Sequence, residues 1–198
     1  MEEVGDLKDR VMALPRWAQV AFTARCARRV HPVFLEWAEG SPAQKTAVAR
    51  AIEAAEVAGG SALCTGASVR CVAVPRSAGK AYAVAQAAYA AYRAAGEDVG
   101  AEEAVKEAIG ATVRVAVMVG PEAAKSVEAG MLRDLEQLRG AGAVERWTNE
   151  TPVAREFFGP LWVGGLPPGW PRRHLLGEVR VPTTFLGRRP RGPESRGR

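Results

Sequence analysis

The sequence is short of the residues on which metal binding and catalysis most often depend. It has only two histidines, His31 and His174, and three cysteines, Cys26, Cys64 and Cys71. Three cysteines cannot form a disulfide framework, and they lack the close pairs that zinc sites use. We therefore expect no metal and no cofactor, and a reduced, cytoplasmic compartment.

Long apolar runs are also missing. The first residues, MEEVGDLKDR, are charged and contain none of the apolar core of a signal peptide. Arg114 interrupts the longest apolar stretch, which therefore falls short of the ~18 residues that a membrane-spanning helix needs. We expect neither a secretion signal nor a membrane segment.

Complete catalytic motifs are absent as well. The stretch VPRSAGKA contains the Gly-Lys of a phosphate-binding loop, but Val74 and Ala81 stand where glycine and Ser or Thr are required. Ser77 and Lys80 match S-x-x-K without its K-T-G companion, so Ser77 is interpreted as a helix cap. No carboxylate is expected in an apolar run as a catalytic acid would be. An enzyme with a pocket invisible in the sequence stays open as an alternative.

Positive charge is concentrated at one end of the chain. Residues 171–198 hold eight arginines and two glutamates, whereas the rest holds 19 Lys and Arg against 20 Asp and Glu. Arginine tails bind nucleic acids with a salt-dependent, mostly nonspecific affinity. One functional hypothesis is therefore nucleic-acid association through Arg188, Arg189, Arg191, Arg196 and Arg198. The alternative is a solubilising, disordered end.

Alanine and helix-boundary signals are abundant. Hydrophobic residues make up 47% of the chain but aromatic ones only 7%, a balance dominated by alanine and valine that favours helices. Ser41, Pro42 and Gln44 form a capping box. Periodicity and breakers predict helices over 7–13, 15–40, 42–58, 78–95, 101–119, 121–139 and 152–158, with an irregular, partly extended loop at 59–77.

These elements predict an all-α fold, a compact bundle of about six or seven helices packed closely through small side chains. We expect a helical domain over residues 1–160 and an irregular Trp- and Pro-rich segment over 161–186 that packs on it. A disordered basic tail is expected over 187–198.

The stretch LPRWAQVAFTARCARRVHPVF predicts a central helix, because apolar residues cover well over half of its circumference. Arg25, Arg28 and Arg29 share the narrow remainder. They form either an anion or partner site, with Arg25 and Arg28 as candidates, or a polar face paired with acids of a neighbouring helix. Pro32 should kink the helix. We expect Arg29 to be partly buried and hydrogen-bonded, and Arg25 and Arg28 to be more exposed.

The same stretch carries the pattern L-x-x-W-x-x-V-x-F-x-A-x-x-x-x-R-x-x-P-x-[FY]. The pattern resembles the opening helix of the bacterial domain of unknown function 416 family, and it is formed by Leu14, Trp17, Val20, Phe22, Ala24, Arg29, Pro32 and Phe34. The weaker similarity of AYAVAQAAYAAYRAAGEDVGAEEAVKEAIGATVRVAVMV extends it over about residues 7–139. The resemblance implies a compact, all-helical cytoplasmic protein without an established activity or site residues.

Large aromatic residues gather after residue 146, outside the periodic helices: Trp147, Phe157, Phe158, Trp162 and Trp170. Tryptophan is enriched in binding hot spots. The leading hypothesis is therefore a non-enzymatic protein-interaction module, such as an inhibitor, an immunity-type protein or an adaptor, with an unidentified protein partner. Alternatively, Trp162 and Trp170 fold back to cap the bundle.

Three tyrosines, Tyr82, Tyr89 and Tyr92, share one side of the helix expected over 78–95. They form either a stacking platform or an apolar face whose hydroxyls reach its edge.

Overall fold

The computed structural model describes residues 2–64, 69, 72–96, 100–162 and 164–172, with side chains from residue 6 onward. Within these ranges the chain forms six α-helices, two short 3-10 helices and no strand, which confirms the all-α prediction. The elements are α1 (Glu2–Met12), α2 (Arg16–Leu35), α3 (Pro42–Ser61), η1 (Arg76–Ala78), α4 (Lys80–Ala94), α5 (Ala101–Val119), α6 (Pro121–Glu145) and η2 (Arg155–Phe158). The expected basic tail and residues 173–186 lie outside the described residues.

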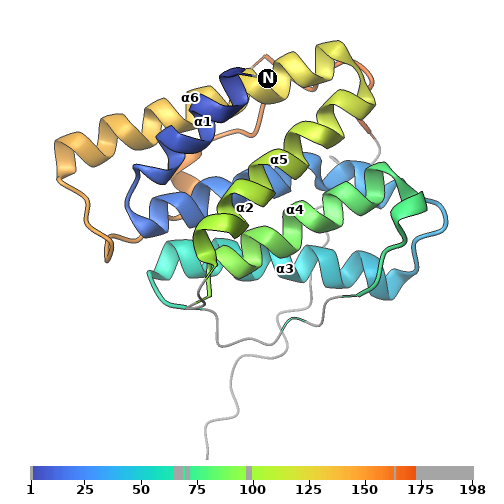
Figure 1. The fold of residues 1–198 in the computed structure, drawn as a ribbon, viewed down its shortest axis with the longest axis horizontal. Coiled ribbons are helices and arrows are strands. Elements are labelled where there is room, and N and C mark those ends of the chain that lie inside the picture. Colours follow the sequence, from blue (N-terminus) through green and yellow to red (C-terminus); the bar gives the residue numbers. More distant parts are fainter. Residues whose placement is uncertain (1, 65–68, 70–71, 97–99, 163, 173–198) are drawn as a thin grey trace, which may run out of the picture.

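Helix α2 lies at the centre of the bundle. It contacts α3, α4, α5 and α6, and fifteen of its twenty residues are buried. In Figure 1, α3 and α4 lie on one side of α2 and run antiparallel to it, whereas α1 and α6 lie along the opposite side. The prediction of a nearly surrounded central helix is therefore confirmed.

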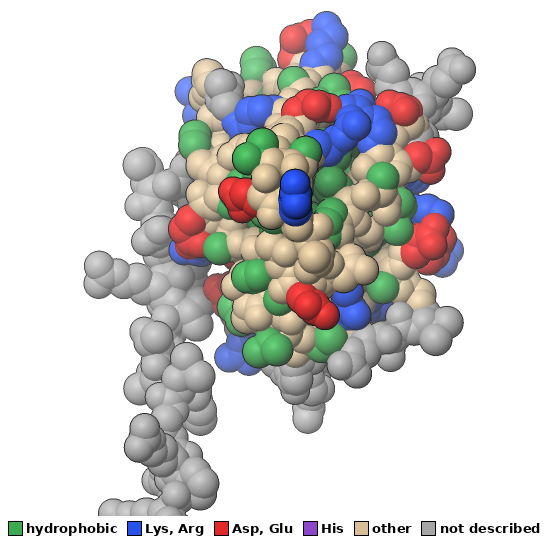
Figure 2. Space-filling view, turned by 90° about the vertical axis from the view of Figure 1, so that its left-hand side faces the viewer, with side chains coloured by type: hydrophobic (Ala, Val, Ile, Leu, Met, Phe, Trp, Pro, Cys, Tyr) green, Lys and Arg blue, Asp and Glu red, His purple; other side chains and the backbone are tan. Residues whose placement is uncertain are grey.

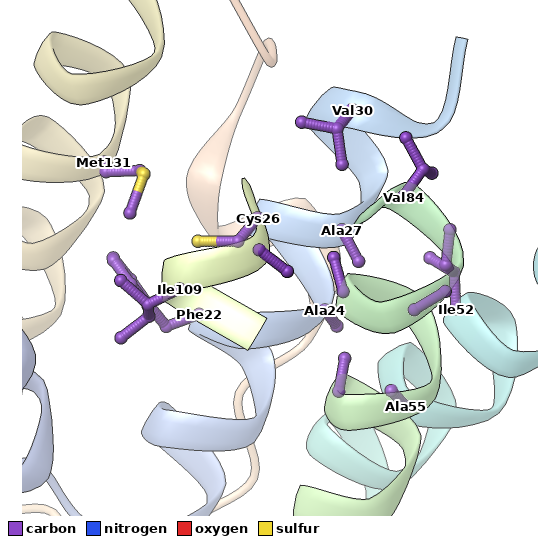
Figure 3. Packing of buried hydrophobic residues seen from close by; sticks show 14 of the residues in the cluster. Phe22, Ala24, Cys26, Ala27, Val30, Ile52, Ala55, Val84, Ile109 and Met131 are labelled. Carbon is purple, nitrogen blue, oxygen red and sulfur yellow. The ribbon is translucent and has the colours of Figure 1, made fainter. Parts of the chain in front are cut away.

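The two sides of α2 are packed with side chains of different size. Ala24 and Ala27 lie toward α3 and α4, where Ala55 comes from α3 (Figure 3). Phe22 lies with Ile109 of α5 on the other side (Figure 3). Because alanine allows helix axes to approach closely, the small residues of α2 let α3 and α4 pack against it. Ile52 of α3 and Val84 of α4 complete the core on that side (Figure 3).

Some helix ends agree with the sequence and others do not. Ser41 Oγ accepts a hydrogen bond from Gln44 N at 3.2 Å, and Gln44 Oε1 accepts one from Ser41 N at 2.9 Å, so the capping box is confirmed. The predicted stop of α3 before Gly59 is wrong, because the helix continues to Ser61. Gly59 instead faces α2, where an added Cβ would lie 3.4 Å from the Cα of Ala21.

The predicted cap at Ser77 is also wrong. Ser77 lies in η1, and α4 begins at Lys80 after Gly79, whose positive φ of 51° turns the chain. Helix α6 continues six residues past the predicted end at Arg139. Helix α2 passes through Pro32 but ends at Leu35, so its predicted end at Gly40 is wrong. The helix expected over 152–158 is only the 3-10 helix η2, and the one expected over 7–13 begins earlier, at Glu2.

Two of the three tyrosine hydroxyls of α4 bind the loop that precedes it, and the third, that of Tyr82, accepts a hydrogen bond from Gln86. Tyr89 Oη accepts a hydrogen bond from Val72 N at 2.9 Å, and Tyr92 Oη accepts one from Val69 N at 3.4 Å. Both side chains are half-buried. The structure therefore supports the interpretation as an apolar face with hydroxyls at its edge.

Residues 146–172, called the C-terminal segment from here on, return along the bundle after α6. Val153 N donates a hydrogen bond to Gly59 O at 2.7 Å, which joins the segment to α3. Phe158 and Trp170 are buried in the core, and Trp162 and Leu166 pack against it. The described part of the irregular region thus packs on the helices.

Candidate functional site

The polar stripe of α2 faces a buried carboxylate on α6. Arg25 and Arg29 are one helical turn apart and therefore share a face. Arg25 Nε donates to Asp134 Oδ2 at 2.7 Å, and Arg29 Nη2 donates to the same oxygen at 2.6 Å. The side chains of Asp134 and Arg29 are 0% exposed and that of Arg25 is 8% exposed. These ion pairs join the central helix to α6 in the protein interior.

A third arginine completes the group. Arg133 donates to Asp134 Oδ1 from Nη2 at 2.7 Å and from Nε at 3.2 Å, and its side chain is 30% exposed. One carboxylate therefore accepts four hydrogen bonds from three guanidinium groups. We refer to Arg25, Arg29, Arg133 and Asp134 as the arginine cluster.

The C-terminal segment covers the cluster with main-chain oxygens. Arg25 Nη2 lies 3.3, 3.1 and 2.7 Å from the carbonyl oxygens of Phe158, Gly159 and Pro160, to which it donates. Arg133 Nη2 also donates to Pro160 O, at 3.1 Å. The Phe158 ring lies 4.8 Å from Arg25 Cζ, within cation–π range. The cluster is therefore what holds residues 158–160 against α2 and α6.

The guanidinium of Arg29 fits against a glycine of α6. Its Nη2 donates to Gly130 O at 3.1 Å, and a Cβ on Gly130 would lie only 3.0 Å from Arg29 Nε. Any larger residue at position 130 would meet the guanidinium. Trp162 closes the other approach, with its ring 5.9 Å from Arg29 Cζ. Arg29 Nε and Nη1 are buried and have no hydrogen-bond partner.

The electrostatics of the cluster are unbalanced. Burial is the main cause that lowers the pKa of Arg25, and the positive charges of Arg29 and Arg133 lower it further. Asp134 acts in the opposite direction. Because arginine keeps its proton in proteins, three positive charges share one negative charge.

The predictions for the three α2 arginines have different outcomes. Arg29 is buried and hydrogen-bonded, as predicted, although its partners lie on α6. Arg25 was predicted to be more exposed than Arg29, but the difference is small: its side chain is 8% exposed against 0%, because Asp134 and the C-terminal segment enclose it. Arg28 is half-buried and pairs with Glu56 of α3, at 2.9 Å from Nε to Oε1 and 2.6 Å from Nη2 to Oε2. The candidate pair Arg25 and Arg28 is thus divided between two faces of α2.

The sequence analysis missed Asp134. The expectation considered only carboxylates within apolar runs, whereas Asp134 lies in a mixed stretch and shares the buried face of α6 with Met131, Leu135 and Leu138. Asp134 could have been found from the sequence, because its spacing from the apolar residues of this helix places it on the same face as they are. Arg133 gives no comparable signal, since a partly exposed arginine is ordinary on a surface helix.

The aromatic residues proposed as partner anchors are largely used inside the fold. Phe158 and Trp170 are each 3% exposed, so the interpretation of these two as exposed anchors is wrong. The rings of Trp162 and Trp170 contact each other edge to face at 5.3 Å, which supports the alternative that they cap the bundle. Trp147 and Phe157 are half-buried and form a similar pair at 5.4 Å.

The cysteine and histidine candidates are also placed by the structure. Cys26 is fully buried, and desolvation raises the pKa of its thiol to about 12, which disfavours the reactive thiolate. His31 is buried on α2. Cys64 is half-buried, with its Sγ 3.4 Å from Arg16 Nη2. Cys71 and His174 lie outside the described residues.

The remaining predictions concern metals, membranes and nucleic acids. Over residues 2–64, 69, 72–96, 100–162 and 164–172, no group of three or more His, Cys, Asp or Glu side chains is arranged to hold a metal ion. Among the helices in those ranges, none is long and apolar enough to cross a membrane. The tail arginines 188, 189, 191, 196 and 198 lie outside the described residues.

The fold and the arginine cluster define an all-helical protein in which buried ion pairs join the central helix to α6. Hydrogen bonds from Arg25 and Arg133 to main-chain oxygens hold the C-terminal segment over these pairs. Comparison with known proteins finds no relative: no protein-family model matches the chain, and neither a curated protein nor a solved structure matches it. Function is therefore inferred from the residues of this chain alone.

Proposed function

We propose that this protein is a non-enzymatic interaction module that binds a protein partner at the end of the bundle where α3 and α6 finish. The observation that carries the proposal is the exposure of large aliphatic side chains there. Val57 and Leu63 are each 68% exposed, and Val144 is 83% exposed. In Figure 1 the last turns of α3 and α6 lie at the same, left-hand side of the molecule. We call Val57, Leu63, Val144 and Trp147 the end face.

The end face holds a disproportionate share of the exposed apolar side chains. Of the six large hydrophobic residues exposed in the described ranges, three belong to it. Single exposed aliphatic residues are common, and their concentration at one end of the bundle is what favours an interaction site there. Figure 2 shows this side of the molecule, with hydrophobic side chains emerging between charged ones. A mixed surface of this kind is typical of a non-obligate interface.

Trp147 gives the end face a rigid aromatic element. Its ring packs on α6, where a Cβ on Gly142 would lie 3.5 Å from Trp147 Cε3, and its Nε1 donates to Glu145 at 2.8 Å. An aromatic side chain held in place before binding loses little conformational entropy in a complex. Tryptophan is also the residue type most enriched in hot spots. Trp147 is therefore retained from the aromatic set as a partner contact.

The test compares two valines that are similarly exposed at different ends of the bundle. Val144→Asp places a charge on the end face, whereas Val117→Asp places one near the end of α5, where Val117 is 62% exposed. Substitutions at such exposed positions change stability by only about 0.5 kcal/mol. Both variants and the unchanged protein are used to capture partners from the native host, and captured proteins are quantified by mass spectrometry.

The proposal predicts one partner that is captured by the unchanged protein and by Val117→Asp but lost with Val144→Asp. A double variant, Val57→Asp with Leu63→Asp, should lose the same partner. Equal capture by all variants, or no partner for any of them, would contradict the proposal. The identity of the partner then distinguishes an inhibitor, an immunity-type protein and an adaptor.

Two alternatives have narrower support. Nucleic-acid association depends on the tail arginines, so its support is the charge of residues 171–198. An enzymatic role would need a pocket with converging polar groups. A pocket of 290 Å³ lies between the end of α2 and the start of α4, and Glu36 and Lys80 are the titratable residues that line it. These two side chains are both exposed, which does not favour catalysis.

A further inference from the structure

The positive charge of the arginine cluster exceeds what the fold compensates. Arg25, Arg29 and Arg133 all pair with the single carboxylate of Asp134. The charges that shift the pKa of Arg25 belong to the other members of the cluster, and among them Asp134 is the one negative group. The cluster thus carries a formal excess of two positive charges in a largely buried place. Buried charge without a counter-charge is costly.

The Arg29 guanidinium also has N–H donors without a hydrogen-bond acceptor. Its side chain is 0% exposed, and its Nη2 is fully used by Gly130 O and Asp134 Oδ2. Its Nε and Nη1 have no partner. Buried donors without an acceptor are rare in native proteins. The charge of Arg29 is therefore only partly compensated within the fold, and it adds to the positive charge beside Arg25 and Arg133.

The present acceptors are neutral and are shared. Arg25 Nη2 divides its two hydrogens among the carbonyl oxygens of residues 158–160, at 2.7 to 3.3 Å. Pro160 O serves Arg25 and Arg133 at once. Guanidinium groups bind phosphate and carboxylate oxygens more strongly, through shorter, charge-assisted hydrogen bonds. The carbonyls therefore occupy positions that the oxygens of an anion would fill better.

The cluster is accessible from one side. Gly159 and Pro160 are exposed, and the Arg133 side chain is 30% exposed. An anion that displaces Pro160 O would reach Arg133 first and then Arg25. Arg28 is outside this arrangement, because its guanidinium is already paired with Glu56.

We propose that Arg25 and Arg133 form an oxyanion-binding site that accepts a phosphate or carboxylate group, free or carried on a larger molecule, while Arg29 supplies positive charge behind them. The anion takes the place of the carbonyl oxygens of residues 158–160. This site goes beyond the proposed interaction module, since it shares no residue with the end face. Either proposal can therefore fail without the other.

The test uses two arginines of the same helix. Arg133→Gln removes a charge from the cluster but leaves Arg25 and Arg29 to compensate Asp134. Arg139→Gln removes the same charge from a side chain that is 53% exposed and pairs with Glu136. Calorimetric titrations of the full chain with inorganic phosphate, and separately with a hexaglutamate peptide, are made at constant ionic strength.

The unchanged protein and Arg139→Gln should bind at least one probe saturably. Arg133→Gln should bind about tenfold more weakly, the loss expected for one charge-assisted hydrogen bond worth about 1.4 kcal/mol. Tighter binding of phosphate indicates a phosphate ligand, and tighter binding of hexaglutamate indicates carboxylates carried by a polypeptide. Binding of neither probe, or equal weakening in both variants, overturns the proposal.

Folding of each variant is checked by thermal unfolding. If Arg133→Gln does not fold, Arg133→Lys keeps the charge and loses the planar fork, so it should fold and still bind more weakly. Unchanged affinity in Arg133→Lys would then overturn the proposal.

Discussion

Removing the charge of Asp134 should destabilise the protein more than any other single change to its ion pairs. Asp134→Asn keeps the shape of the side chain but leaves Arg25, Arg29 and Arg133 without a carboxylate. It also points an amide N–H₂ at one of the guanidinium groups. Asp134 and Arg29 are 0% exposed, so water cannot solvate the freed charge of Arg29.

The magnitude follows from the number and burial of the bonds. Asp134 accepts four hydrogen bonds, and three of them, at 2.6, 2.7 and 2.7 Å, are as short as charge-assisted bonds should be. Breaking a buried pair by removing one partner costs about 3–5 kcal/mol. That is a large part of the roughly 5–15 kcal/mol that stabilises a typical domain. For a chain of this size, Tm should fall by roughly 6–20 °C.

Urea unfolding followed by circular dichroism gives the free energy of unfolding for each variant. The midpoint should fall while the slope stays constant, since the surface exposed on unfolding is the same. Glu136→Gln is the matched control, because Glu136 is on the same helix but 58% exposed in its pairs with Arg10 and Arg139. It should cost about 1 kcal/mol or less. A loss for Asp134→Asn no larger than for Glu136→Gln would refute the reasoning.

Three further predictions concern other parts of the chain. Gly130→Ala places a Cβ 3.0 Å from Arg29 Nε and should lower the free energy of unfolding by about 1–3 kcal/mol. Gly140→Ala, on the same helix but with nothing within 4 Å, should raise it by about 0.5–1 kcal/mol. Equal effects of the two substitutions would contradict the packing of Arg29. With a pKa of about 12, Cys26 should react with a thiol reagent at pH 8 only after unfolding. Labelling is located by peptide mapping. If Cys26 of the native protein is labelled as fast as the half-buried Cys64, the result counts against the burial of Cys26. Because folded Cys26 keeps its proton between about pH 9 and 12 while the unfolded thiol loses it, this group makes stability fall as pH rises through that range. If the tail binds nucleic acid, deleting residues 187–198 should weaken binding and flatten its salt dependence, and an unchanged titration would end that hypothesis.

Local features of the sequence predicted local features of the structure well. The capping box at Ser41 and the Gly-Pro break before α6 act within a few residues, and both lie where the sequence indicated. Helix ends failed where packing overrides the local signal. Gly59 would stop an isolated helix, but here it lies against Ala21 of α2, so α3 continues to Ser61.

The central position of α2 could be predicted because its apolar arc is wider than one neighbour can cover. What the sequence could not show is which of its arginines face the interior. Arg25, Arg28 and Arg29 look alike in a helical projection. The burial and the ion-pair partner of each arginine depend on Glu56 of α3 and on Asp134 of α6. Asp134 is more than 100 residues away from them along the chain.

The same division holds for the whole molecule. Helix propensity, capping and apolar periodicity are local properties, so they were enough to predict the helices, their approximate number and the surrounded position of α2. Packing between distant elements brings three guanidinium groups to one carboxylate and places the C-terminal segment over them. A buried ion pair forms only where residues that are distant in sequence lie next to each other in the protein interior, and the packing of the helices determines which residues these are.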